Sequence, residues 1–161
     1  MWPRKRRFRR SNPQAGLTLL ELILACSILL ILSSAAVPIA RYNIIRQKEA
    51  ELHRDLREMR EAIDRYKDTC DKNLIRSELG SECYPPDLDT LVKGVQLGAG
   101  NEHKIRFLRR IPVDPTTGRA EWGLRAIQDD PDSTAWGGKN VFDVYSRSYR
   151  TSLDGTRYAD W

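Results

Sequence analysis

The sequence predicts an α+β fold in which a long N-terminal helix packs on a small antiparallel sheet. An apolar run of 21 residues, Leu17 to Val37, is followed by a charged stretch, Arg41 to Asp71, in which apolar residues recur at helical spacing. Beyond residue 84, short apolar segments alternate with turns rich in proline and glycine, a pattern typical of short strands. A length of 161 residues fits one domain, or one domain with an appendage.

The positive charge of the chain is concentrated at its start. Lys and Arg number 27 against 22 Asp and Glu, which gives a net charge of +5 at pH 7. Six of these basic residues and no acid lie in residues 1–16, so residues 17–161 hold 21 basic and 22 acidic side chains, a net charge of −1. We therefore expect no basic face on the folded domain and no nucleic-acid partner.

Residues 17–40 predict a membrane-spanning helix. In the run Leu17 to Val37, 16 residues are apolar and only Glu21 is ionisable. As a helix this run would measure about 31 Å, close to the thickness of a bilayer's hydrocarbon core. The preceding cations predict a cytoplasmic N-terminus, with the rest of the chain on the other side of the membrane. Two weaker alternatives are a signal peptide cleaved near Ala36 and a lipoprotein signal ending at Cys26.

Glu21 is the residue in this run that needs an explanation. A carboxylate inside a membrane span costs about 2.5–3.5 kcal/mol at the helix centre and calls for a partner. One interpretation places Glu21 near the interface, where it reaches the lipid headgroups. In the other, cleavage after Gly16 creates an α-amino group on Leu17, and the amine of a neighbouring copy neutralises the carboxylate. Self-assembly would then satisfy the charge.

The segment Gly16-Leu17-Thr18-Leu19-Leu20-Glu21 resembles the leader signal of type IV pilins and type II secretion pseudopilins, which have a basic leader, cleavage after glycine and glutamate as the fifth mature residue. Pro38 falls where these proteins commonly have a proline that loosens the helix. The resemblance implies a type IV pilin-like fold and a prepilin peptidase that removes residues 1–16 and N-methylates Leu17. The family usually has phenylalanine in place of Leu17.

The stretch from Arg41 to Asp71 predicts an amphipathic helix that continues beyond Pro38, where a bend or a break is expected. Ion pairs of Glu61 with Arg65 and of Asp64 with Lys67 are expected on its outer faces. One apolar stripe is expected to pack on the domain's own sheet, and it consists of Ile45, Leu52, Leu56, Met59, Ile63 and Tyr66.

Cys70 and Cys83 are candidates for a disulfide. They would lie on the extracytoplasmic side, where thiols can be oxidised. The bond would close a loop of 14 residues, worth about 3 kcal/mol in the chain-entropy model. A zinc site is the weaker alternative because His53 and His103 lack ligand spacing to the cysteines. Cys26 is interpreted as a small apolar residue.

The C-terminal half predicts one further helix and a pair of strands. Asp87 to Val92 is expected to form a short helix, capped by Asp87 and ended by Gly94. Ala120 to Leu124 and Val141 to Ser146 are strand candidates, and Leu153 to Thr156 is a turn candidate.

Five segments in residues 51–161 resemble the major pseudopilin of type II secretion, the G-type subunit. These are Glu51 to Tyr66, Tyr84 to Val92, Arg110 to Pro115, Phe142 to Ser146, and Leu153-Asp154-Gly155 with Ala159-Asp160-Trp161. The resemblance makes residues 41–161 a periplasmic domain. It also implies a calcium ion in the C-terminal loop, held by Asp154 and Asp160 with oxygens near Ser146 and Ser152. The carboxylates usual in the longer loop of that family are missing.

The predicted function is structural, because no arrangement of residues suggests catalysis and the chain is not expected to be an enzyme. We expect a single-pass inner-membrane protein that polymerises into a periplasmic type II secretion pseudopilus. Its expected partners are further copies of itself, minor pseudopilins and the inner-membrane assembly platform. The alternatives are a type IV pilin of a surface fibre, used for adhesion, motility or DNA uptake, and a binding domain anchored by a single span.

Overall fold

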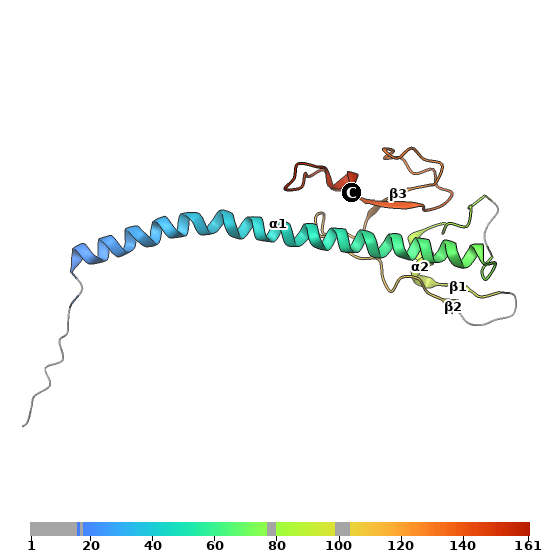
Figure 1. Cartoon of the computed structure of the whole chain (residues 1–161), viewed down its shortest axis with the longest axis horizontal. Helices are drawn as coiled ribbons and strands as arrows, with labels where there is room; N and C mark the ends of the chain where they lie inside the picture. Colours follow the sequence, from blue (N-terminus) through green and yellow to red (C-terminus); the bar gives the residue numbers. More distant parts are fainter. Residues whose placement is uncertain (1–15, 17, 77–79, 99–103) are drawn as a thin grey trace, which may run out of the picture. The chain divides into compact units, whose positions relative to one another are not determined.

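The computed structural model describes residues 16, 18–76, 80–98 and 104–161. The chain divides into two compact units, Met1–Arg41 and Tyr42–Trp161. Helix α1, Leu19–Asp71, begins in the first unit and ends in the second. The other helices and strands of the described residues belong to the second unit (Figure 1). The predicted α+β class with a long N-terminal helix is confirmed.

Helix α1 contains Pro38 without a break in its helical assignment. At its start, the hydroxyl of Thr18 accepts a hydrogen bond from the amide of Glu21 at 3.2 Å, the contact that an N-cap residue makes. Because proline has no amide hydrogen, the carbonyl of Ser34 lacks the donor that residue 38 would otherwise supply. The helix ends at Asp71, the predicted residue.

The predicted apolar stripe on α1 forms one wall of the core, except at its first position. Leu52, Leu56, Met59 and Ile63 are each at most 1% exposed, whereas Ile45 is 36% exposed. Ile45 was therefore wrongly assigned to the core. The remaining core members come from the loops, α2 and the strands, and include Tyr84, Leu88, Leu91, Phe107, Leu108, Trp122, Val141, Val144 and Tyr158.

The ion pairs on the outer face of α1 differ partly from those expected. Arg65 lies 3.8 Å from Glu61, as predicted. Lys67 pairs with Asp71 at 3.4 Å and not with Asp64. On a helix, residues three and four positions apart are both neighbours, so spacing alone did not distinguish Asp64 from Asp71 as the partner of Lys67.

Helix α2, Leu88–Lys93, has the predicted caps. The carboxylate of Asp87 accepts the amide of Thr90 at 2.6 Å, and the chain turns at Gly94 with φ of 78°. Strand β1, Val95–Gln96, then pairs antiparallel with β2, Lys104–Ile105. This small sheet was missed, because two-residue strands carry too little alternation to be recognised in a sequence.

A second antiparallel sheet joins β3, Trp122–Arg125, to β4, Asp143–Ser146, with Trp122 opposite Ser146. Both strands overlap the predicted ones. Gly123 faces the ring of Tyr145, and a Cβ atom at this position would overlap that ring. A 3₁₀ helix, η1, Tyr158–Asp160, follows the predicted turn. The expectation of a single sheet was wrong, because β1–β2 and β3–β4 are separate.

Candidate functional site

The first candidate site is the apolar part of α1 in the first unit. By length and composition, α1 contains one segment able to cross a membrane. Burying a large apolar side chain contributes about 1.5–3 kcal/mol, so this surface strongly favours lipid or protein over water. Between Leu19 and Val37, each large apolar side chain is more than half exposed. These residues are Leu19, Leu20, Leu22, Ile23, Leu24, Ile28, Leu29, Leu30, Ile31, Leu32 and Val37.

The polar side chains of this segment fall into two groups. The hydroxyl of Ser27 donates to the carbonyl of Ile23 at 2.8 Å, and that of Ser34 donates to the carbonyl of Ile31 at 2.7 Å. These hydroxyls are satisfied within the helix, as an apolar environment requires. The Glu21 carboxylate is different, because it has no hydrogen-bond or ion-pair partner among the described residues. The Glu21 carboxylate lies in an apolar surface, so a partner for it has to come from outside the helix.

The predicted cleavage pair precedes this helix. Gly16 is exposed, and Leu17 lies outside the described residues. Pro38, the other residue predicted to serve assembly, lies inside α1 and is exposed. The cleavage site between Gly16 and Leu17, and its spacing from Glu21, therefore stay predictions from the sequence.

The disulfide between Cys70 and Cys83 is present, with the Cα atoms 5.5 Å apart. Cys70 is 3% exposed in the last turn of α1, and Cys83 lies in the segment that leads to α2. The bond thus fastens the end of the long helix to the start of the C-terminal half. Cys26 is a free, exposed cysteine.

The predicted calcium ligands Asp154 and Asp160 have separate partners. One carboxylate oxygen of Asp154 accepts hydrogen bonds from the hydroxyl of Ser152 and from the amide and hydroxyl of Thr156, the last two at 3.0 and 2.7 Å. These donors, Ser152 first, lower the pKa of Asp154 from 3.8 to about 2. Both oxygens of Asp160 accept from the guanidinium of Arg157, at 3.0 and 2.8 Å.

As placed, these residues do not form a donor set for calcium. A calcium ion needs six to eight oxygen ligands, whereas hydrogen-bond donors surround one oxygen of Asp154 and a guanidinium covers Asp160. Ser146 donates its hydroxyl to Asp114 at 2.6 Å instead. In the part of the chain that the structure describes, no three His, Cys, Asp or Glu side chains are grouped to hold a metal. Calcium binding remains a prediction from the sequence resemblance.

The C-terminal loop is held against α1 by contacts that the sequence did not reveal. The carboxylate of Glu49 accepts the amide of Leu153 at 2.8 Å and the phenol of Tyr158 at 3.1 Å. Burial, followed by this bond to Glu49, raises the pKa of Tyr158. The indole of Trp161 stacks on the imidazole of His53 with ring centroids 4.0 Å apart. His53 is thus used in packing.

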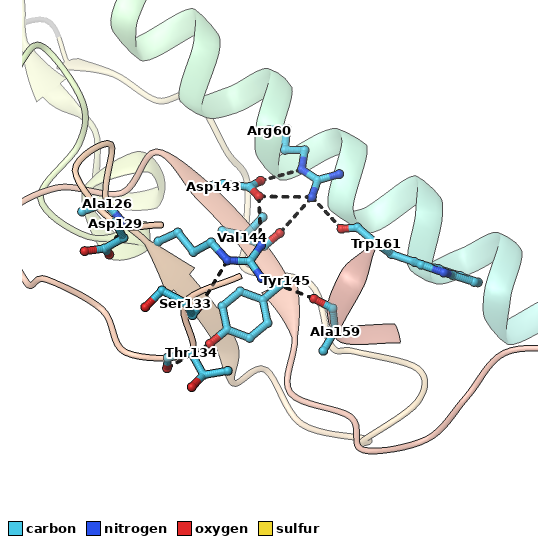
Figure 2. Close-up of polar contacts among 11 residues, drawn as sticks. Arg60, Ala126, Asp129, Ser133, Thr134, Asp143, Val144, Tyr145, Ala159 and Trp161 are labelled. Atoms are coloured by element: carbon cyan, nitrogen blue, oxygen red, sulfur yellow. Dashed lines mark hydrogen bonds and ion pairs between the residues drawn. The ribbon is translucent and has the colours of Figure 1, made fainter. Parts of the chain in front are cut away.

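A second network that was missed joins α1 to β4 and the end of the chain (Figure 2). The guanidinium of Arg60 donates to the Asp143 carboxylate and to the main-chain oxygen of Trp161, both at 2.7 Å, and to the carbonyl of Val144 at 3.2 Å. Arg125 approaches the other oxygen of Asp143 at 3.4 Å. Asp143 therefore lies between two arginines. In the sequence, Asp143 stood out as an acidic residue within the strand candidate Val141 to Ser146, but its partners could not be identified.

One comparison with known proteins bears on the N-terminus. Residues 11–37 match the family model of the prokaryotic N-terminal methylation motif. The match begins directly after the basic residues and covers Gly16, Leu17, Glu21 and the apolar run. It indicates a type IV pilin-like prepilin that is a substrate of prepilin peptidase, and the observed α+β fold is consistent with that class. No curated protein and no solved structure matches the chain.

Proposed function

We propose that the chain is a structural subunit of the type II secretion pseudopilus, which polymerises to drive protein export across the outer membrane. The observation that carries this proposal is the apolar surface of α1 with the single carboxylate of Glu21, both within the methylation motif of residues 11–37. A filament supplies both partners that this helix needs, since neighbouring helices cover its apolar side chains and a neighbouring amine pairs with Glu21.

The proposed assembly begins at the membrane. A prepilin peptidase hydrolyses the bond between Gly16 and Leu17, which leaves a carboxylate on Gly16 and an amine on Leu17, and then transfers a methyl group to that amine from a methyl donor. Until extraction, lipid covers the exposed side chains of α1 and holds the subunit in the inner membrane, with the domain from residue 41 in the periplasm. Minor pseudopilins and the inner-membrane platform then direct the exchange of lipid for neighbouring helices.

The position of the disulfide supports a pseudopilin over a pilin of a surface fibre. Pilins commonly enclose their C-terminal region in a disulfide, whereas Cys70 and Cys83 precede that region. Here the C-terminal loop is closed by hydrogen bonds to Glu49 and within Ser152–Thr156.

Two measurements test the proposal. Mass spectrometry of the mature N-terminus is expected to find methylated Leu17, and an intact Met1 or an acylated Cys26 would refute a pilin-like subunit. Glu21→Ala is expected to leave the protein in the membrane and to abolish filaments, because the register contact with the neighbouring amine is lost. The matched control is Glu58→Ala, which removes an exposed carboxylate from the same helix. Normal assembly of the Glu21 variant would contradict its pairing role.

A further inference from the structure

A cleft of about 460 Å³ on the second unit is lined by three arginines, which corrects the expectation from the overall charge balance that the folded domain has no basic face. It lies between the turn that follows Asp114 and the segment that follows β4. Three arginines and one glutamate supply its charges, with the fully exposed ring of Tyr149 beside them. We call these the cleft arginines, and they are Arg119, Arg147 and Arg150.

The cleft arginines are free to bind a partner. Their side chains are exposed, and none of their guanidinium groups hydrogen-bonds or pairs with a carboxylate within the described residues. Arg60, Arg125 and Arg157 differ, because each has a carboxylate within 3.5 Å. With three arginines against Glu121 the cleft has a net positive charge, and such a surface attracts an acidic partner.

The walls of the cleft are held in place by buried polar contacts. Asp114 is fully buried and accepts the amide of Thr116 at 2.7 Å and the hydroxyl of Ser146 at 2.6 Å. The amide of Ser148 donates to that same Ser146 hydroxyl at 3.1 Å. Asp114 is therefore occupied by these donors and does not neutralise the arginines. These contacts hold the backbone from which the cleft arginines extend.

A turn of opposite charge is presented elsewhere on the same unit. Asp129, Asp130 and Asp132 lie within four residues. Asp129 fixes the turn from inside, because its carboxylate accepts the amides of Ala126 at 2.7 Å and Gly137 at 3.0 Å. Asp130 and Asp132 are exposed, and neither has a cationic group within ion-pair distance among the described residues, although Asp132 interacts electrostatically with Arg157 at longer range. We call this segment the acidic turn.

We infer that the cleft arginines of one subunit bind the acidic turn of a second copy of this chain. The two surfaces are opposite in charge, the backbone beneath each is held by hydrogen bonds to an aspartate, and no ion pair joins them within the described residues of one chain. A contact between two different surfaces of identical subunits is heterologous, and repeating it generates an open helical polymer. This inference rests on the proposed filament function and adds a contact between the folded domains to the contact between the helices.

A second cationic cleft is less suited to this role. It is smaller, about 360 Å³, and is lined by Arg65, Arg106 and Arg109. Arg65 is already engaged by Glu61 and by the carbonyl of Phe107. The neighbouring exposed pair Arg109 and Arg110 therefore provides a control with the same change of charge.

The test is a reciprocal charge reversal in the full-length chain, expressed with its prepilin peptidase and assembly machinery. The cleft variant is R147E/R150E, the turn variant is D130K/D132K, and the control is R109E/R110E. Sheared filaments are quantified by immunoblotting and electron microscopy, and folding is monitored by near-ultraviolet circular dichroism. We expect the cleft and turn variants each to lower filament yield about tenfold, and the control to change it by less than about twofold. Combining all four substitutions is expected to restore assembly, because the attraction is re-established with its sign exchanged.

A second measurement keeps the inference testable if a charge variant misfolds. In a Cys26→Ala background, oxidation of the D132C/R150C variant is expected to give a ladder of disulfide-linked oligomers, since every copy carries both partners. The inference is overturned if no ladder forms, or if the folded cleft and turn variants assemble like the control. Assembly of the wild-type chain in those experiments would leave the proposed function intact. Failure of the processed wild-type chain to form filaments would overturn both.

Discussion

Removing the charge of Asp143 is expected to loosen the second unit at the place where three segments meet. Asp143→Asn keeps the size of the side chain but leaves Arg60 and Arg125 without a carboxylate. The Arg60 side chain is 39% exposed, so its pair with Asp143 is worth about 1 kcal/mol. Arg125 is 13% exposed, and loss of its charged contact costs about 1.5–3 kcal/mol. We expect a total loss of about 2.5–4 kcal/mol in the free energy of unfolding.

For a unit of the size of residues 42–161, a loss of about 3 kcal/mol lowers the melting temperature by about 10 °C. The assay is thermal unfolding of the full chain in detergent micelles, followed by near-ultraviolet circular dichroism. Asp64→Asn is the matched control, because Asp64 is exposed and has no ion pair among the described residues. Equal melting temperatures for the two variants would refute the assigned role of Asp143. A cycle with Arg60→Met separates the Arg60 contribution from that of Arg125.

Two further predictions concern the loops that surround the core. The double variant Cys70→Ser/Cys83→Ser is expected to lower the free energy of unfolding by about 3 kcal/mol in denaturant titrations. The control Cys26→Ser is expected to leave it unchanged. A loss below about 1 kcal/mol in the double variant would show that other contacts order the loop. The depressed pKa of Asp154, about 2 against an ordinary 3.8, means that its contribution to stability is present above pH 3.8 and is lost as the pH falls towards 2. A carboxyl chemical-shift titration with a midpoint near 3.8 would contradict the hydrogen bonds to Ser152 and Thr156.

Sequence patterns succeeded where a local rule determines the structure. The cap at Asp87 and the stop at Gly94 fixed α2, because each acts on backbone groups within one turn. The spacing of Leu52, Leu56 and Met59 identified the buried face of α1. Ile45 has the same spacing but is exposed, since the elements that cover α1 determine where the stripe stops being buried. The C-terminal loop contacts α1 at Glu49, four residues beyond Ile45, through the amide of Leu153.

The missed parts depend on partners far away in the chain. Arg60 and Asp143 are 83 residues apart, and Glu49 and Tyr158 are 109 apart, so no window of sequence contains both members of either pair. The hydrogen bonds of Asp154 and Asp160, which a family resemblance had suggested as calcium ligands, were also not foreseen: Ser152 and Thr156 donate to Asp154, and Arg157 donates to Asp160. The nearest hydrogen-bond donors determine which contacts a carboxylate makes.

The two units of the chain differ in how their apolar surface is satisfied. The second unit buries the stripe on α1 with its own loops, helix and strands, and the Cys70–Cys83 bond and the Arg60–Asp143 pair hold those elements together. Among the described residues of the first unit, α1 is the only helix or strand, and its large apolar side chains there are exposed. A surface of that kind is not stable in water, so lipid or other copies must cover it. In the proposed filament the uncovered helix supplies the driving force, while Glu21 and the pairing of the cleft arginines with the acidic turn limit the registers in which copies can stack, because charges placed out of register remain unpaired.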